Sequence, residues 1–191
     1  ATSVERFDGV HLKHYPIYAS SERWKWVNAI IETSGNQLWV GTDGGFWQIG
    51  QDRVDRIAPD VIRNGVRSIV KDDKDTLYIG SETGLHIYKD GKIETVLLEN
   101  NSFSSANFIV GLHLEGERLW LITRNGLYSM NLKDRKPVHY ANNLTEKEAS
   151  AHQWFIVLHR EGELIVEVPI DTRNKIGLIS FPIDELPAGT F

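Results

Sequence analysis

The sequence has no cysteine among its 191 residues, which excludes disulfide bonds, thiolate nucleophiles and zinc sites built on cysteine. It also has no apolar run of about eighteen residues, the length that a membrane-spanning helix needs, so we expect no membrane insertion by this segment. Residues 1–10 lack the basic start and the apolar run of a secretory signal peptide. The chain is expected to be soluble, and these absences leave its compartment open.

Charge of one sign is not concentrated anywhere in the sequence. The 26 acidic and 21 basic residues are dispersed along the chain and give a net charge of −5. Because there is no basic stripe, we expect no nucleic-acid partner. With 41% hydrophobic and 25% charged residues, the composition is that of a globular protein, and residues 1–191 are expected to form a single domain.

A repeat is the strongest signal in the sequence, because a fixed period determines architecture more firmly than local propensity. Its central motif occurs three times, with Leu38 and Leu77 spaced by 39 positions and Leu77 and Leu119 by 42. The three copies read Leu38-Trp39-Val40-Gly41-Thr42, Leu77-Tyr78-Ile79-Gly80-Ser81 and Leu119-Trp120-Leu121-Ile122-Thr123. A fourth, degraded copy starts near Trp154.

Each repeat contains four short apolar stretches of strand length, separated by turn residues. A glycine follows each central motif, at Gly45, Gly84 and Gly126, which predicts a hairpin turn with a positive φ angle. Four antiparallel strands at this period are typical of a β-propeller blade. We therefore predict an all-β fold of about four propeller blades, complete or partial, with approximate repeats at 24–60, 64–98, 107–140 and 152–185.

The aromatic residues of the central motif, Trp39, Tyr78 and Trp120, are expected to pack between blades, where large flat side chains bury much area. The two ends of the chain are harder to place. Residues 8–16 have strand character but no obvious partner, while the fourth copy lacks an outermost strand. Pairing of the two would close a four-bladed ring, whereas an open arc would expose a blade face and favour a homodimer. Both arrangements fit the sequence.

The central motif, followed after two residues by glycine and an aromatic or leucine, resembles the propeller repeat of two-component regulators. Copies one and two carry the motif well, copy three has Ile122 in place of the glycine, and the resemblance covers residues 24–140. It implies a periplasmic sensor domain of hybrid histidine kinases or diguanylate cyclases, a carbohydrate or other small-molecule ligand, and more blades than four. Propeller enzymes of the streptogramin-lyase and lactonase types share parts of the repeat, so function does not follow from it directly.

The residue patterns that catalysis requires are missing from the sequence. The seven histidines are scattered, with no His-Glu-x-x-His frame, and there is no Gly-x-Ser-x-Gly elbow. The acidic run Asp72, Asp73 and Asp75 lacks the spacing of a calcium loop and falls in an expected hairpin. We therefore expect no catalytic residue, no metal and no cofactor, and the chain itself is not expected to be an enzyme.

In a propeller, the segments that enter the innermost strands and the turns between the second and third strands lie on the same face. This face is the expected ligand site. Aromatic rings beside cationic and amide groups suit sugars. The candidate binding residues are Trp24, Trp26, Arg63, Asn64, Asn107 and His152. For Trp24 and Trp26, packing at a blade edge is the competing interpretation, since the two alternate as strand residues do.

The leading interpretation is a non-catalytic ligand-sensing or recognition module of a bacterial signal-transduction receptor, whose output domain lies outside this chain. One alternative is a protein-interaction or dimerisation scaffold, which a large exposed apolar blade face would favour. A further alternative is a propeller enzyme of the streptogramin-lyase or lactonase type, which would need a bound divalent metal.

Overall fold

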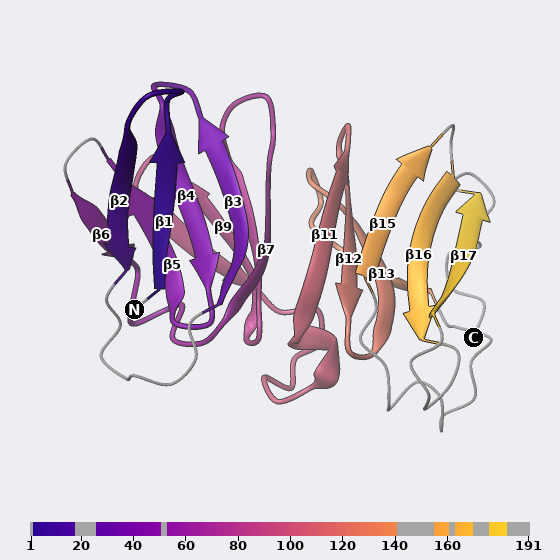
Figure 1. Cartoon of the computed structure of the whole chain (residues 1–191). Coiled ribbons are helices and arrows are strands. Elements are labelled where there is room, and N and C mark those ends of the chain that lie inside the picture. The colour runs from indigo at the N-terminus through magenta and orange to yellow at the C-terminus, as the bar shows by residue number, and fades with distance from the viewer. Residues whose placement is uncertain are drawn as a thin grey trace.

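The described part of the chain consists almost entirely of antiparallel β-strands arranged in consecutive sheets (Figure 1). The computed structural model describes residues 2–17, 26–50, 53–140, 155–160, 163–169 and 176–182, and only the backbone in the last three ranges. The helical element in these ranges is one short 3₁₀ turn, Ser105–Asn107. The predicted all-β fold is confirmed.

Three sheets have four strands each, and in each sheet the spatial order of the strands follows the chain. We refer to them as blades 1, 2 and 3. Blade 1 contains β3 (Val27–Thr33), β4 (Gln37–Thr42), β5 (Gly45–Ile49) and β6 (Val54–Ile57). Blade 2 contains β7 (Val66–Lys71), β8 (Leu77–Ser81), β9 (Gly84–Lys89) and β10 (Lys92–Val96). Blade 3 contains β11 (Ile109–Glu115), β12 (Arg118–Thr123), β13 (Gly126–Asn131) and β14 (Pro137–Tyr140).

Two smaller sheets flank the three blades at opposite ends of the array (Figure 1). After blade 3 comes a three-stranded sheet made of β15 (Phe155–Arg160), β16 (Glu163–Pro169) and β17 (Ile176–Pro182). Before blade 1 comes a hairpin made of β1 (Thr2–Phe7) and β2 (Leu12–Ile17). The next described strand after β2 is β3, and β2 lies beside β6, the last strand of blade 1.

Among the described strands, residues 8–16 show no pairing with the three-stranded sheet, and ring closure stays a prediction. Their strand pairs instead with β1, in a register that sets Val4 opposite Tyr15 and Phe7 opposite Leu12. The physical reason is local: the Asp8 carboxylate accepts hydrogen bonds from the backbone N–H groups of Val10 and His11, at 2.9 and 2.7 Å, and so fixes a tight turn. A neighbouring strand joined by such a turn has little loop-closure entropy to overcome.

The first strand of each blade, and of the three-stranded sheet, carries a β-bulge near its start. The register shifts at Asn28 in β3, at Arg67 in β7, at Val110 in β11 and at Val157 in β15. A bulge redirects one side chain relative to the regular pleat. In blades 1 and 2 the redirected side chains are polar, and both take part in a network described below.

The core lies between the blades rather than within any one of them. Trp39 of blade 1, Tyr78 of blade 2 and Trp120 of blade 3 are 3%, 6% and 0% exposed. This confirms the prediction that the aromatic residues of the central motif pack in the core. The cluster between blades 1 and 2 comprises Trp39, Phe46, Ile62, Val66, Ile69, Leu77 and Ile79. A second cluster joins blades 2 and 3, and a third joins the β1–β2 hairpin to blade 1.

The glycine after each central motif has the positive φ angle that the sequence predicts, 120° at Gly45, 136° at Gly84 and 116° at Gly126. The hydroxyl that ends each central motif holds this turn, since it donates to the glycine carbonyl and accepts from a backbone N–H of the turn. The hydroxyls are those of Thr42, Ser81 and Thr123. Identical local chemistry thus explains why the three hairpins have the same shape.

Candidate functional site

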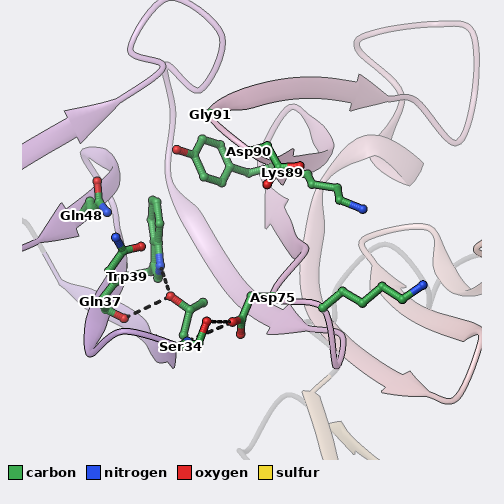
Figure 2. Close-up of a pocket in the computed structure, with 11 residues that line it drawn as sticks. Ser34, Gln37, Trp39, Gln48, Asp75, Lys89, Asp90 and Gly91 are labelled. Atoms are coloured by element: carbon green, nitrogen blue, oxygen red, sulfur yellow. Dashed lines mark hydrogen bonds between the residues drawn. The ribbon is translucent and has the colours of Figure 1, made fainter.

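A pocket with a volume of about 410 Å³ lies between blades 1 and 2, at the end of the sheets where the β3–β4, β7–β8 and β9–β10 turns gather (Figure 2). We call it the interblade pocket. Its lining residues are Thr33, Ser34, Gln37, Trp39 and Gln48 of blade 1 and Lys74, Asp75, Tyr88, Lys89, Asp90 and Gly91 of blade 2. Five lining residues come from blade 1 and six from blade 2, so a bound molecule would touch two sheets at once.

Aromatic rings form the base of the interblade pocket. Trp39 stacks on Phe46 with ring centroids 5.2 Å apart and planes inclined by 14°, and Tyr88 tilts against Trp39 at 4.9 Å. The indole N–H of Trp39 donates to Oγ1 of Thr33 at 2.9 Å, which fixes the orientation of the ring. Trp39 is only 3% exposed, so these packed rings form a rigid wall of the pocket and present little ring surface to a ligand.

The side-chain amides of Gln37 and Gln48 stand beside Trp39 on the blade 1 wall (Figure 2). In the part of the chain that the structure describes, neither amide has a hydrogen-bond partner. Across the pocket, the exposed Lys74 and Lys89 side chains make no ion pair with a described residue. Amides supply both donors and acceptors, and lysine supplies a positive charge, so the pocket can meet hydroxyl groups and one acidic group.

Asp75 joins the two blades at the edge of the pocket. Its carboxylate accepts hydrogen bonds from the backbone N–H of Ser34, at 3.0 Å, and from the Ser34 hydroxyl, and it also accepts from Nζ of Lys71 at 2.8 Å. These bonds, first the one from Lys71 and then those from Ser34, lower the pKa of Asp75 to about 2. Asp75 is therefore ionised at neutral pH and holds the β3–β4 turn of blade 1 against blade 2.

Trp26, Arg63, Asn64 and Asn107, four of the binding residues expected from the sequence, belong to the opposite end of the blades and do not line the interblade pocket. Trp26 is 66% exposed just before β3, and its backbone N–H donates to the Asp43 carboxylate at 3.3 Å. Arg63 and Asn64 are exposed in the connection before β7, where Nε of Arg63 donates to the Asp60 carbonyl at 2.9 Å. Trp24 and His152 lie outside the described residues. Ligand contact at all of these positions stays a prediction.

Asn107 has a clear internal role in the connection between blades 2 and 3. Its side chain is fully buried, and its Oδ1 accepts from the backbone N–H groups of Leu98 and Glu99 at 2.7 and 3.3 Å. Its Nδ2 donates to the carbonyls of Glu99 and Asn101 at 3.0 and 2.8 Å. Asn107 thus organises this loop from inside, and ligand contact by its side chain would require the loop to open.

A charged network that the sequence did not reveal also joins blades 1 and 2, at the end opposite the interblade pocket. The guanidinium of Arg67 donates to the carboxylates of Asp43, at 2.9 Å, and Glu82, at 2.5 Å. The amide of Asn28 donates to the Asp43 carboxylate and to the Val66 carbonyl, at 3.0 and 2.9 Å. Asn28 and Arg67 are the two bulge residues of their strands, and a repeat pattern cannot reveal the direction in which a bulge turns a side chain.

His86 is the buried histidine of the described part of the chain, and burial also raises the pKa of the Tyr78 hydroxyl and, to about 12, that of Tyr128. The ring of His86 lies between the hydroxyls of Ser81, at 2.8 Å from Nε2, and Thr95, at 2.9 Å from Nδ1, and it is 1% exposed. Burial lowers the pKa of His86 to about 4. Among the described residues there is no group of three or more His, Asp or Glu side chains that could hold a metal ion, and no helix there is long and apolar enough to cross a membrane.

Comparison with known proteins supports the fold. No family model matches the sequence, and no curated protein matches it. Two structures of the extracellular domain of BT4673 from B. thetaiotaomicron, assigned to a hybrid two-component system in one and to a one-component system in the other, match with TM-scores of 0.64 and 0.60. Both are 19% identical to this chain and cover 84% of it, while it covers 20% and 22% of them.

The extracellular domain of BT3049 from the same organism, assigned to a hybrid two-component system, matches with a TM-score of 0.57 at 18% identity. The match covers 86% of this chain and 23% of that one. The chain therefore spans about a fifth of the length of these structures. The likeness shows that the fold is shared, and it agrees with the resemblance to two-component regulators drawn from the repeat.

Proposed function

We propose that this chain is part of a non-catalytic ligand-sensing module of a bacterial signal-transduction receptor, situated in the periplasm, and that a carbohydrate binds in the interblade pocket. The shared fold with extracellular domains of two-component systems supports the sensing role. The observation that carries the proposal is the pocket itself: an aromatic base, unpaired amides and two lysines contributed by two different blades. The amides can pair with the hydroxyls of a sugar, and the lysines can pair with an acidic substituent.

The position of the pocket also suggests how binding could be transmitted. Blades 1 and 2 meet through the apolar cluster around Trp39 and through polar links at both ends, Ser34 with Asp75 and Asp43 with Arg67. A ligand that contacts Gln48 and Lys89 would add a third link across the same interface. It would therefore favour the blade arrangement to which it binds best, and this differential affinity is what shifts a conformational equilibrium.

The test is calorimetric titration of the chain with a panel of di- to tetrasaccharides, both neutral and uronic-acid-containing. The variants Gln48→Ala and Lys89→Ala should weaken binding of the best saccharide by about tenfold each, as expected for the loss of one hydrogen bond or ion pair at a buried contact. Lys136→Ala, at an exposed lysine of the connection before β14, is the matched control and should leave binding unchanged.

Two results would contradict this proposal in different ways. If Trp26→Ala or Asn64→Ala abolishes binding while the pocket variants do not, the ligand site lies at the opposite end, where the sequence predicted it. If no saccharide in the panel binds at millimolar concentration, the carbohydrate assignment is wrong. A stable dimer in light scattering, together with an absence of binding, would favour the interaction scaffold instead.

A further inference from the structure

A second cavity, which we call the hairpin groove, lies between β2 and blade 1, where β2 runs beside β6 (Figure 1). Its volume is about 400 Å³. The strand β2 supplies Lys13, His14, Tyr15 and Pro16 to its lining, and blade 1 supplies Trp47, Arg53 and Val54. The hairpin groove shares no lining residue with the interblade pocket. The two cavities lie on opposite faces of blade 1, since the adjacent residues Trp47 and Gln48 of β5 line one cavity each.

Basic side chains collect at the hairpin groove. Lys13, His14 and Arg53 line it, and no aspartate or glutamate of the described residues does. Arg6 lies directly opposite Lys13 in the β1–β2 register, and both share the face of Tyr15, which packs against blade 1. Like charges directly opposite each other destabilise a strand pair, so an anion bound beside them would stabilise the hairpin.

Two carboxylates pair with these basic groups, but neither of them lines the hairpin groove. Nε of Arg53 donates to Oδ2 of Asp55 at 2.5 Å, and Nδ1 of His14 lies 3.2 Å from Oε1 of Glu5. The side chains of Arg53 and His14 are 80% and 55% exposed, so both pairs contribute little and exchange readily. The bond to Asp55 uses one of the five guanidinium donors of Arg53, and the other four make no hydrogen bond with a described residue. Such donors bind tetrahedral oxyanions in a bidentate manner.

The remaining wall of the hairpin groove is rigid and largely apolar. Tyr15 and Trp47 are 6% and 5% exposed, and the indole N–H of Trp47 donates to the Thr42 hydroxyl at 3.1 Å. These rings are therefore fixed walls, while Pro16 and Val54 keep part of their apolar surface accessible. A volume of about 400 Å³ lies in the usual range for a small organic ligand. The groove therefore suits an organic molecule that carries an oxyanion.

We propose that the hairpin groove binds a small organic ester of phosphate or sulfate. Arg53 and Lys13 bind the tetrahedral oxyanion from the two sides of the groove, and the carbon skeleton of the ligand contacts Pro16 and Val54. The two kinds of ester present the same arrangement of oxygen atoms and differ in charge, so their relative affinities identify the one that the groove selects. This inference does not depend on saccharide binding in the interblade pocket.

The test is calorimetric titration of the chain, at low ionic strength, with phenyl phosphate and phenyl sulfate, and with phenol as the uncharged control. At least one ester should bind at least about tenfold more tightly than phenol, because charge-assisted hydrogen bonds hold its oxyanion. Arg53→Ala and Lys13→Ala should each weaken its binding about tenfold, the usual effect of losing one such bond. Lys92→Ala, at an exposed lysine of β10, is the matched control and should leave binding within about twofold of the parent chain.

The place of binding can be read from the indole N–H resonances of Trp47 and Trp39 in a proton–nitrogen NMR spectrum. The bound ester should shift the Trp47 resonance and leave that of Trp39 unchanged, because the two rings line different cavities. Arg53→Ala and Lys13→Ala should keep the thermal unfolding midpoint of the parent chain, since both side chains are exposed. Their weaker binding would then report the loss of ligand contacts.

Three results would overturn the inference. Equal affinity for the esters and for phenol would show that the groove does not select an oxyanion. An equal loss of affinity in Lys92→Ala and in Arg53→Ala would assign binding to the overall charge of the chain. A shift of the Trp39 resonance instead of the Trp47 resonance would place the ester in the interblade pocket.

Discussion

Ile109 of blade 3 lies directly over Gly80 of blade 2, so close that a β-carbon at residue 80 would come within 2.7 Å of its Cγ2 atom. The glycine that makes the repeat recognisable in the sequence is therefore a packing feature between blades. It is distinct from the turn glycines, which are needed for their positive φ angles. Blade 3 has Ile122 at the position equivalent to Gly41 and Gly80.

The variant Gly80→Ala should lower the free energy of unfolding by about 1–3 kcal/mol, the usual cost of forcing an extra methyl group into a packed core. Gly50→Ala is the matched control, because Gly50 is exposed and its nearest neighbour would be at an ordinary 3.7 Å from the new β-carbon. Urea denaturation followed by tryptophan fluorescence measures both. Equal stability of Gly80→Ala and the parent chain would mean that the blades separate easily.

The free energy of unfolding should decrease as the pH is lowered through the range in which His86 titrates. Burial lowers its pKa from 6.5 to about 4, so between these values the unfolded chain binds a proton that the folded chain does not. Stability is therefore complete above about pH 6.5 and declines as the pH falls towards 4, by up to roughly 3 kcal/mol. The variant His86→Gln, which cannot titrate, should show a flatter profile over this window in urea denaturation at fixed pH values. A profile as steep as that of the parent chain would assign the effect to another group.

The architecture could be read from the sequence because its determinants are local. Strand lengths, the glycine after Thr42 and the alternation of Trp39 with smaller residues all act within one hairpin, and the three clear repeats fold as expected. The pairing of residues 8–16 could not be read, since a strand with one free edge accepts any suitable partner and the turn at Asp8 decided the matter. Strand propensity alone does not contain that information.

The position of the interblade pocket could not be predicted from the sequence either. Loops that enter the innermost strands were expected to form the ligand face, and Trp26 and Arg63 do lie there. The pocket at the other end depends on the approach of two turns, those at Ser34 and Asp75, which are 41 positions apart. Asn107 shows the same limit at a single residue, because an amide in a loop has the same sequence signature whether it faces solvent or organises the loop from inside.

Asn107→Ala should destabilise the connection between blades 2 and 3. The substitution leaves the buried N–H of Leu98 without its partner, and an unsatisfied buried group costs about 1–3 kcal/mol. Asn100→Ala is the control, since Asn100 is exposed in the same loop. Hydrogen exchange should reveal faster exchange at Leu98 and Glu99 in Asn107→Ala alone, together with a lower unfolding midpoint. Unchanged protection at Leu98 would show that this loop is held by its other contacts.

The link between Ser34 and Asp75 should stabilise the chain in a way that disappears in acid. The ordinary pKa of an aspartate is 3.8, and the bonds from Lys71 and Ser34 lower that of Asp75 to about 2. A carboxylate with a lowered pKa contributes stability that is fully present above its ordinary pKa and is lost as the pH falls through the folded value. Asp75→Asn should therefore lower the thermal midpoint at pH 7, and the difference from the parent chain should shrink as the pH approaches 2.

Asp73→Asn provides the control for this prediction, because Asp73 is exposed in the same β7–β8 turn. The substitution removes the same charge as Asp75→Asn. Its effect on the thermal midpoint should be small at every pH, since an isolated surface charge contributes little. Combining Asp75→Asn with Ser34→Ala should cost less than the sum of the two single effects, as expected for residues that act through one contact. Additive effects would show instead that Asp75 acts through Lys71 within blade 2, and that the two blades are held together by their apolar cluster and by Arg67.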